Sequence, residues 1–125
     1  MSTTRSTLSH VLSKRAAMQN KVQALEAEKC KSMAEVRFGV DSIDTALIEL
    51  LARRFGYMDA AARIKTDRDT VRDEMRKAQV IANVEAAASQ AQIPVETIKE
   101  IWDRLVEASI DYELVAWDRL NTNPA

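Results

Sequence analysis

Residues 33–65, MAEVRFGVDSIDTALIELLARRFGYMDAAARIK, decide the fold of this chain. Apolar residues recur there at steps of three and four, namely Val36, Val40, Ile43, Leu47, Leu50, Leu51, Phe55, Met58 and Ala62. This period predicts one long amphipathic helix, which at ~1.5 Å per residue reaches almost 50 Å. A 125-residue chain is too small to cover such a helix by itself, so we expect a partner, most simply a second copy.

The remaining sequence predicts two further helices. A polar break at residues 66–70 precedes a second helix, expected to begin near Val71 and to end near Ala91. Pro94 opens a third helix, at a position where its missing N–H costs nothing, and this helix runs to about Leu120. Only two Gly, two Pro and 5% aromatic residues fit an all-α, three-helix chain with a long first helix.

Residues 1–29 form a polar N-terminal extension, and residues 30–121 form the expected helical domain. The stretch 10–29 is compatible with a helix, but its thin apolar stripe favours a frayed or loosely docked segment. Residues 1–25 contain Arg, Lys and Ser, and no acid precedes Glu26, so an amphipathic targeting peptide remains a minor alternative to a cytoplasmic protein.

Charge and composition exclude several classes of function. A formal net charge of −1 creates no global field for nucleic acid or for an anionic membrane. No apolar run approaches the ~20 residues needed to cross a bilayer, and no secretory signal is recognisable. A single cysteine, Cys30, and a single histidine, His10, make an intrachain disulfide impossible and a soft-ligand metal site very improbable.

Positive charges lie inside the apolar pattern of the first helix. Arg54 and Lys65 are eleven residues apart, so they differ by about 20° around the helix axis and share a face, about 16 Å apart. Arg37 lies about 25 Å before Arg54 and cannot reach the same ligand from the same chain. Inward-facing cations without obvious carboxylate partners predict an anionic ligand. In the third helix Ser109 and Glu113 are four apart and therefore neighbours within an apolar stripe.

The ordered pattern Arg37-x-x-x-Asp41-x-x-Asp44, Leu51-x-Arg53-Arg54 and Lys65 resembles the all-helical chorismate mutases, including the related isochorismate pyruvate lyases. The resemblance covers roughly residues 30–120. Within it, the segment 53–65 is similar to the lyase branch, where Arg-Arg-x-x-Tyr-x-x-Ala-Ala-x-x-x-Lys is common. Each motif alone is weak evidence for the family, but the ordered set of motifs with this spacing is hard to obtain by chance.

This resemblance implies an intertwined homodimer of three-helix chains with no cofactor and no metal. Its substrate would be a small dianion, chorismate or isochorismate, and each active site would borrow an arginine from the other subunit. By position, Arg37 corresponds to the borrowed arginine. Arg54 corresponds to the residue that grips a substrate carboxylate, and Lys65 to the lysine that bonds the ether oxygen and a carboxylate.

The resemblance extends to the second and third helices. The segment Val71-Arg72-Asp73-Glu74-Met75-Arg76 resembles the mutase pattern Val-Arg-Asp-x-x-Arg. The family then implies that Asp73 holds the substrate hydroxyl through its backbone, that Arg76 is a supporting cation, and that Ser109 binds a carboxylate.

Two positions depart from the commonest family pattern. Lys77 stands where many mutases have a glutamate that binds the substrate hydroxyl, which puts that contact in doubt. Glu113 stands where a glutamine usually donates to the ether oxygen, although some fungal mutases have glutamate there. A carboxyl group donates a hydrogen bond only when protonated, so this role of Glu113 requires a raised pKa or acidic conditions.

Each candidate also has a purely structural interpretation. Arg54 and Lys65 could lie along the bundle surface with their charges in water, and residues 72–77 could be a solvated helix start. Ser109 could bond back to its own helix, and Glu113 could form a buried ion pair with an arginine. These interpretations leave room for a non-catalytic helical binding module.

The spacing and the family resemblance nevertheless favour a functional site, and the mutase reaction explains the residue types. Rearrangement of chorismate to prephenate is a one-step pericyclic reaction that needs no nucleophile, metal or redox cofactor. Cationic side chains can clamp the two carboxylates in the reactive conformer, and fixed donors can stabilise charge at the ether oxygen. We therefore predict a cytoplasmic chorismate mutase of aromatic amino-acid biosynthesis, with Lys65, Glu113 and Arg54 as catalytic residues. Isochorismate pyruvate lyase, giving salicylate and pyruvate, is the first alternative.

Overall fold

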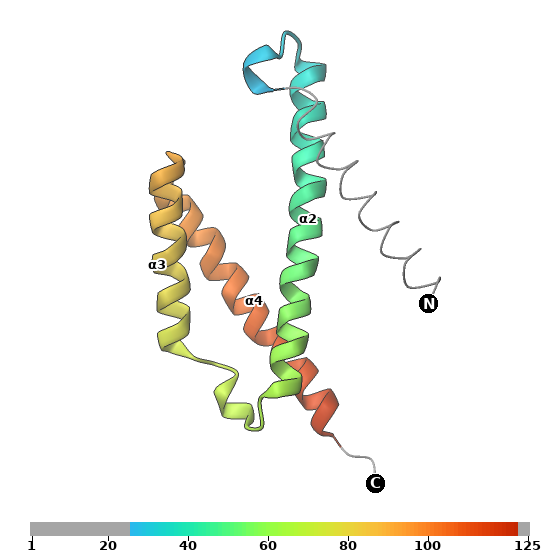
Figure 1. The fold of residues 1–125 in the computed structure, drawn as a ribbon, viewed down its shortest axis with the longest axis vertical. Coiled ribbons are helices and arrows are strands. Elements are labelled where there is room, and N and C mark those ends of the chain that lie inside the picture. Colours follow the sequence, from blue (N-terminus) through green and yellow to red (C-terminus); the bar gives the residue numbers. More distant parts are fainter. Residues whose placement is uncertain (1–25, 123–125) are drawn as a thin grey trace, which may run out of the picture. The chain divides into compact units, whose positions relative to one another are not determined.

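A computed structural model of the chain describes residues 26–122, and all regular structure in that range is helical (Figure 1). The elements are the short 3-10 helix η1 (Ala27–Lys29), α2 (Met33–Ile64), the 3-10 helix η2 (Arg68–Thr70), α3 (Glu74–Ala91) and α4 (Val95–Asn121). The prediction of an all-α chain with three helices and a long first helix is confirmed. Most of the stretch 10–29 lies outside the described residues, and the proposed domain boundary stays a prediction.

The chain divides into two units, residues 1–53 and 54–125, with the boundary inside α2. In the first unit, α2 begins directly after Ser32, whose Oγ accepts a hydrogen bond from the Glu35 N–H at 3.2 Å. The Glu35 carboxylate in turn accepts from the Lys31 N–H at 2.8 Å. These reciprocal bonds satisfy N–H groups that a helix start leaves free.

Large apolar side chains stay exposed along the part of α2 that belongs to the first unit. They are Met33, Val36, Phe38, Val40, Ile43, Leu47, Ile48 and Leu50, with exposed fractions between 39% and 66%. The helical period is therefore as predicted, but this stripe finds no cover among the described residues of the chain. Pairing of this stripe with a second copy of the chain stays a prediction.

In the second unit, α3 begins three residues later than the apolar pattern predicts, at Glu74 instead of Val71. Asp73 caps the helix, because its side chain accepts from the Arg76 N–H at 3.0 Å. Val71 is instead buried after η2 and belongs to the core. Pro94 likewise lies one residue before α4, as its N-cap, so the missing N–H is still harmless there.

The core of the second unit is small. Val71, Val106 and Ile110 form its buried centre. Around them pack the partly buried residues Val80, Leu114 and Trp117. Helices α3 and α4 lie side by side and contribute most of this packing (Figure 1). The buried polar residues of the described range are Ser109 and Glu113, both on α4.

None of the helices in the described range combines the length and the apolarity needed to cross a membrane.

Candidate functional site

A pocket of about 500 Å³ lies within the second unit, bounded by the end of α2, the connection after it, the start of α3 and the middle of α4. This volume falls in the usual range for small-molecule sites. Its polar lining consists of Arg54, Lys65, Thr70, Asp73, Arg76, Lys77, Ser109 and Glu113. Its apolar lining consists of Met58, Ala61, Val71, Val80, Val106 and Ile110.

Helix α2 contributes Arg54, Met58, Ala61 and Lys65 to the pocket. These positions follow one another at steps of four, three and four residues, the spacing that keeps side chains on one face of an α-helix. The shared face of Arg54 and Lys65 that the sequence predicts is therefore present, with two small or flexible apolar residues between the cations.

The Arg54 guanidinium is held by a neutral group. Its Nη1 donates to Ser109 Oγ, and the Ser109 hydroxyl donates to the Leu105 carbonyl at 2.7 Å. Ser109 is 4% exposed. The hydroxyl proton is thus used within α4, as the structural interpretation of Ser109 expects, while the oxygen faces Arg54.

Lys65 and Glu113 form an ion pair with 2.7 Å between Lys65 Nζ and Glu113 Oε2. The Glu113 side chain is 6% exposed, and among the described residues this oxygen accepts no well-aligned hydrogen bond. The Lys65 backbone is fixed as well, because its carbonyl accepts from Trp117 Nε1 at 3.0 Å. The buried ion pair anticipated for Glu113 exists, but its cation is a lysine instead of an arginine.

Arg76 is the second cation of the pocket with a neutral partner. Its Nη1 donates to the Gln79 side-chain oxygen at 2.7 Å. Burial lowers the pKa of Arg54, and the positive charge of Arg76 lowers it further. The two guanidiniums therefore repel each other in the pocket, and among the described residues neither has a carboxylate partner.

Lys77 has two carboxylate partners across the α3–α4 contact. Its Nζ lies 2.9 Å from Asp103 Oδ1 and 2.9 Å from Glu107 Oε2. Glu107 also accepts from Arg72 Nη2 at 2.7 Å. Hydrogen bonds from Arg72 and then from Lys77 lower the pKa of Glu107 to about 2, and hydrogen bonds to Glu107 and then to Asp103 raise the pKa of Lys77.

The sequence-predicted site residues fall into two groups. The pocket brings together Arg54, Lys65, Asp73, Arg76, Lys77, Ser109 and Glu113. Arg37 is exposed, lies in the first unit and is not part of this lining. For all eight of these residues, the proposed contacts with a substrate stay predictions.

Sequence reasoning did not identify Asp103 and Glu107. The available signal was their spacing of four residues, which places both on one face of a helix. On an exposed helix such a pair usually belongs to a solvated face, so the signal is weak without the position of Lys77.

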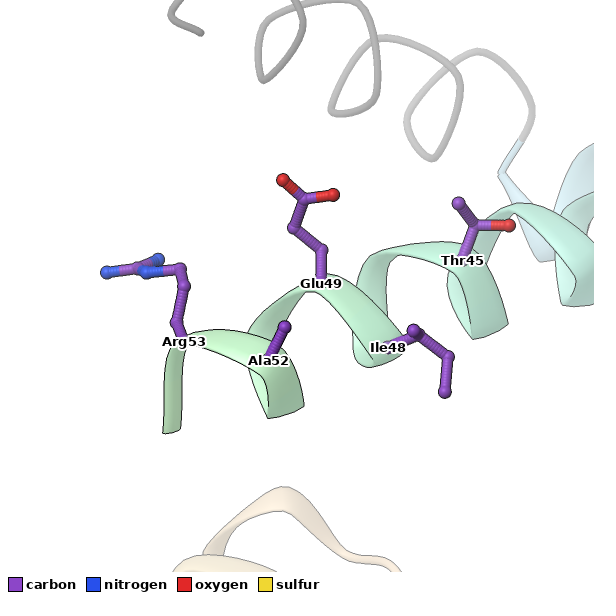
Figure 2. Close-up of a pocket in the computed structure, with 5 residues that line it drawn as sticks. All are labelled: Thr45, Ile48, Glu49, Ala52 and Arg53. Carbon is purple, nitrogen blue, oxygen red and sulfur yellow. The ribbon is translucent and has the colours of Figure 1, made fainter. Parts of the chain in front are cut away.

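A hollow of about 610 Å³ in the first unit is larger but is lined by one helix only (Figure 2). Thr45, Ile48, Glu49, Ala52 and Arg53 border it, and Figure 2 shows Glu49 and Arg53 extending away from α2. The polar side chains that line this hollow come from one helix and do not converge on a common point, so the hollow is a poor candidate for a binding site. Among residues 26–122, no group of three or more His, Cys, Asp or Glu side chains is placed to hold a metal ion.

Comparison with known proteins gives two findings. Residues 36–114 match the family model described as chorismate mutase type II, which is more than half of the chain. The chain is also similar to the isochorismate pyruvate lyase of Pseudomonas aeruginosa, with 22% identity over 90 residues, which cover 72% of this chain and 89% of the relative.

Proposed function

This chain belongs to the chorismate mutase type II family, and from this premise we propose that it is a chorismate mutase that rearranges chorismate to prephenate in aromatic amino-acid biosynthesis. The observation that carries the proposal is the pair Arg54 and Arg76, which face one pocket with neutral partners only. Lys65 lines the same pocket beside them.

The charge of the pocket supports a dianionic substrate. Four cations, Arg54, Lys65, Arg76 and Lys77, face two carboxylates, Asp73 and Glu113, among its lining residues. A substrate carboxylate between Arg54 and Arg76 relieves their mutual repulsion and accepts charge-assisted hydrogen bonds. The binding free energy gained in this way orients the ring and its side chain in the conformer that brings the reacting carbons together.

Lys65 is the proposed donor to the ether oxygen. Negative charge grows on this oxygen as the C–O bond breaks, so a fixed ammonium stabilises the transition state more than the ground state. Glu113 holds the Lys65 ammonium at 2.7 Å in the ligand-free site. For Glu113 to donate to the ether oxygen, its carboxyl must carry a proton and the pair must separate. The Asp73 backbone, just before α3, is the proposed partner of the substrate hydroxyl.

We further propose that the active protein is a homodimer in which Arg37 completes the site of the partner subunit. The support is the exposed apolar stripe of α2 around Arg37, since exposed apolar side chains in such number call for a protein partner. A second copy of α2 supplies a surface of the same kind.

Isochorismate pyruvate lyase is the second candidate, because the similar protein from Pseudomonas aeruginosa carries that name. The segment from Tyr57 to Lys65 favours the lyase. Ser109 and the segment 71–76 favour the mutase. The same cations can serve both reactions, because both substrates are dianionic enol-pyruvyl ethers.

Product analysis tests the proposal. The full-length protein is incubated in EDTA with chorismate and, separately, with isochorismate between pH 5 and 8, and the products are identified by chromatography. We expect prephenate from chorismate as the faster reaction. Faster formation of salicylate from isochorismate would establish the lyase instead. Turnover of neither substrate, combined with saturable binding of both, would establish the binding module.

A further inference from the structure

The proposed catalytic lysine lies at the very end of α2. This helix spans Met33–Ile64, so Lys65 is the first residue beyond it. The Lys65 N–H still donates to the Ala61 carbonyl at 2.9 Å. The Lys65 carbonyl, in contrast, finds no N–H further along the same helix, as is general for the last carbonyls of a helix. The helix by itself therefore fixes Lys65 on one side only.

The indole N–H of Trp117 supplies the missing donor. Trp117 Nε1 lies 3.0 Å from the Lys65 carbonyl oxygen. An indole N–H can only donate, and a partly buried indole needs such an acceptor. Trp117 lies on α4 and packs against the buried core of the second unit. The end of α2 is thereby attached to the core through one hydrogen bond to its backbone.

Helix α4 thus holds both ends of Lys65. Glu113 Oε2 lies 2.7 Å from the Lys65 ammonium nitrogen, and Trp117, four residues further along α4, binds the Lys65 carbonyl. Residues four apart lie on one face of a helix. The contact with Glu113 is inside the pocket, where an anionic ligand can compete for the ammonium. Trp117 does not line the pocket, so its contact with the Lys65 backbone does not depend on a ligand.

A second contact joins α4 to the connection that follows Lys65. The Arg68 guanidinium donates to both carboxylate oxygens of Asp118, at 2.8 and 3.2 Å. The two side chains are 51% and 47% exposed, and exposed ion pairs contribute little to holding a structure together. The Trp117 hydrogen bond is therefore the contact that matters most for the position of Lys65.

We propose that Trp117 is a positioning residue, which fixes the backbone of Lys65 and thereby sets where the Lys65 ammonium stands in the pocket. The inference rests on the proposed function, in which this ammonium donates to the ether oxygen of the substrate. Loss of the indole N–H leaves the Lys65 carbonyl unpaired and lets the end of α2 shift. A catalytic donor that is displaced by about 1 Å loses much of its effect.

Two probes separate the placement of Lys65 from binding in general. One is an oxabicyclic dicarboxylate shaped like the rearranging substrate, and the other carries a methylene group in place of its ether oxygen. Calorimetry gives both dissociation constants, and their ratio is the ether preference. A hydrogen bond from an ammonium predicts an ether preference of roughly tenfold or more in the wild-type protein. Lys65→Met, which lacks the donor, is the reference for its complete loss.

The deciding variant carries benzothienylalanine in place of Trp117. This amino acid keeps the shape of the double ring, but sulfur replaces the indole N–H, so only the donor is removed. We expect the ether preference to fall below about threefold. The same replacement of Trp102 is the matched control, since this other tryptophan also lies on α4 and does not line the pocket. The control should keep the wild-type preference.

The ratio distinguishes positioning from damage to the fold, because damage weakens both probes alike. A wild-type ether preference without the Trp117 donor would overturn the positioning role, whether or not both probes bind more weakly. An equal fall of the preference in the Trp102 control would overturn it as well.

Failure of the proposed function would look different. If the wild-type protein binds both probes equally well, Lys65 does not donate to the ether oxygen, and the role of Trp117 falls together with that of Lys65. If neither dicarboxylate binds the wild-type protein at millimolar concentration, the proposed function itself fails.

Discussion

Ser109 shows how one hydroxyl group can fix a cation. Its proton is donated to the Leu105 carbonyl, so its oxygen is oriented to accept from Arg54. The family resemblance implies that Ser109 binds a substrate carboxylate directly, but for its hydroxyl to donate to a carboxylate the hydrogen bond to the Leu105 carbonyl would first have to break. Positioning of Arg54 is the function that the observed hydrogen bonds support.

Replacement of Ser109 by alanine should therefore weaken the grip of Arg54 on its substrate carboxylate. We expect kcat/KM for chorismate to fall by roughly tenfold, the loss typical of a hydrogen bond to a charged group. Steady-state kinetics with Ser109→Ala and the exposed control Ser89→Ala check this. Equal values for the two variants would show that Ser109 does not position Arg54.

Glu113 is held against the Lys65 ammonium, with 2.7 Å between Glu113 Oε2 and Lys65 Nζ. Glu113→Gln removes the negative charge of this pair but keeps the shape of the side chain. If the carboxylate positions the Lys65 ammonium, we expect kcat for chorismate to fall by roughly tenfold. Steady-state kinetics measure this, and an unchanged or higher kcat would show that the carboxylate is not needed to position Lys65.

Helices α3 and α4 are joined by ion pairs as well as by a small core. Arg72, Lys77 and Lys99 each contact a carboxylate across or beside this helix pair. Exposed ion pairs contribute little to folding one by one. Their clearer consequence is the pKa of Glu107, lowered from 4.5 to about 2.

This shift predicts an acid-dependent stability. A carboxylate whose pKa is lower in the folded state contributes stability above its unfolded pKa and loses that contribution as pH falls through the folded pKa. The difference in free energy of unfolding between the wild type and Glu107→Gln should thus be largest above pH 4.5 and should decrease as the pH falls toward 2. Urea unfolding at several pH values measures it. A constant difference would contradict the ion pairing of Glu107.

The helices were largely predictable from the sequence, because their apolar period and cation spacing are local properties. The start of α3 could not be predicted from the sequence, since Val71 continues the apolar pattern but is buried just after η2 instead of within a helix. The position of Arg54 and Lys65 on one face of α2 could be predicted from their spacing, and both line the pocket. The carboxylate partners of Lys77 could not be predicted, because Asp103 and Glu107 contact Lys77 only through the packing of α4 against α3.

Among the described residues, far more large apolar side chains are exposed than are buried, and this imbalance limits the stability of a single chain. The described residues bury five apolar side chains, Ala62, Val71, Ala88, Val106 and Ile110. They leave the α2 stripe of the first unit exposed. So small a core favours stabilisation by association of chains, and in the proposed homodimer this association would also complete the active site.

Mixing of two inactive variants tests the shared site. If Arg37 acts in the partner's site, a dimer of one Arg37→Ala chain and one Arg54→Ala chain contains one intact site and one doubly mutated site. Random exchange then restores about a quarter of the wild-type activity, since half of the dimers are mixed. Mass spectrometry confirms that mixed dimers form. Mixed dimers without activity would contradict the contribution of Arg37 across the interface.

The proposed action of the Arg54 guanidinium on the substrate from inside the pocket can be compared directly with that of the neighbouring Arg53. Both belong to α2, but only Arg54 lines the pocket. The deciding measurement is kcat/KM for chorismate of Arg54→Ala against Arg53→Ala. We predict a loss of about a hundredfold or more for the former and of less than about threefold for the latter. Equal losses in the two variants would show that Arg54 has no special role in the reaction.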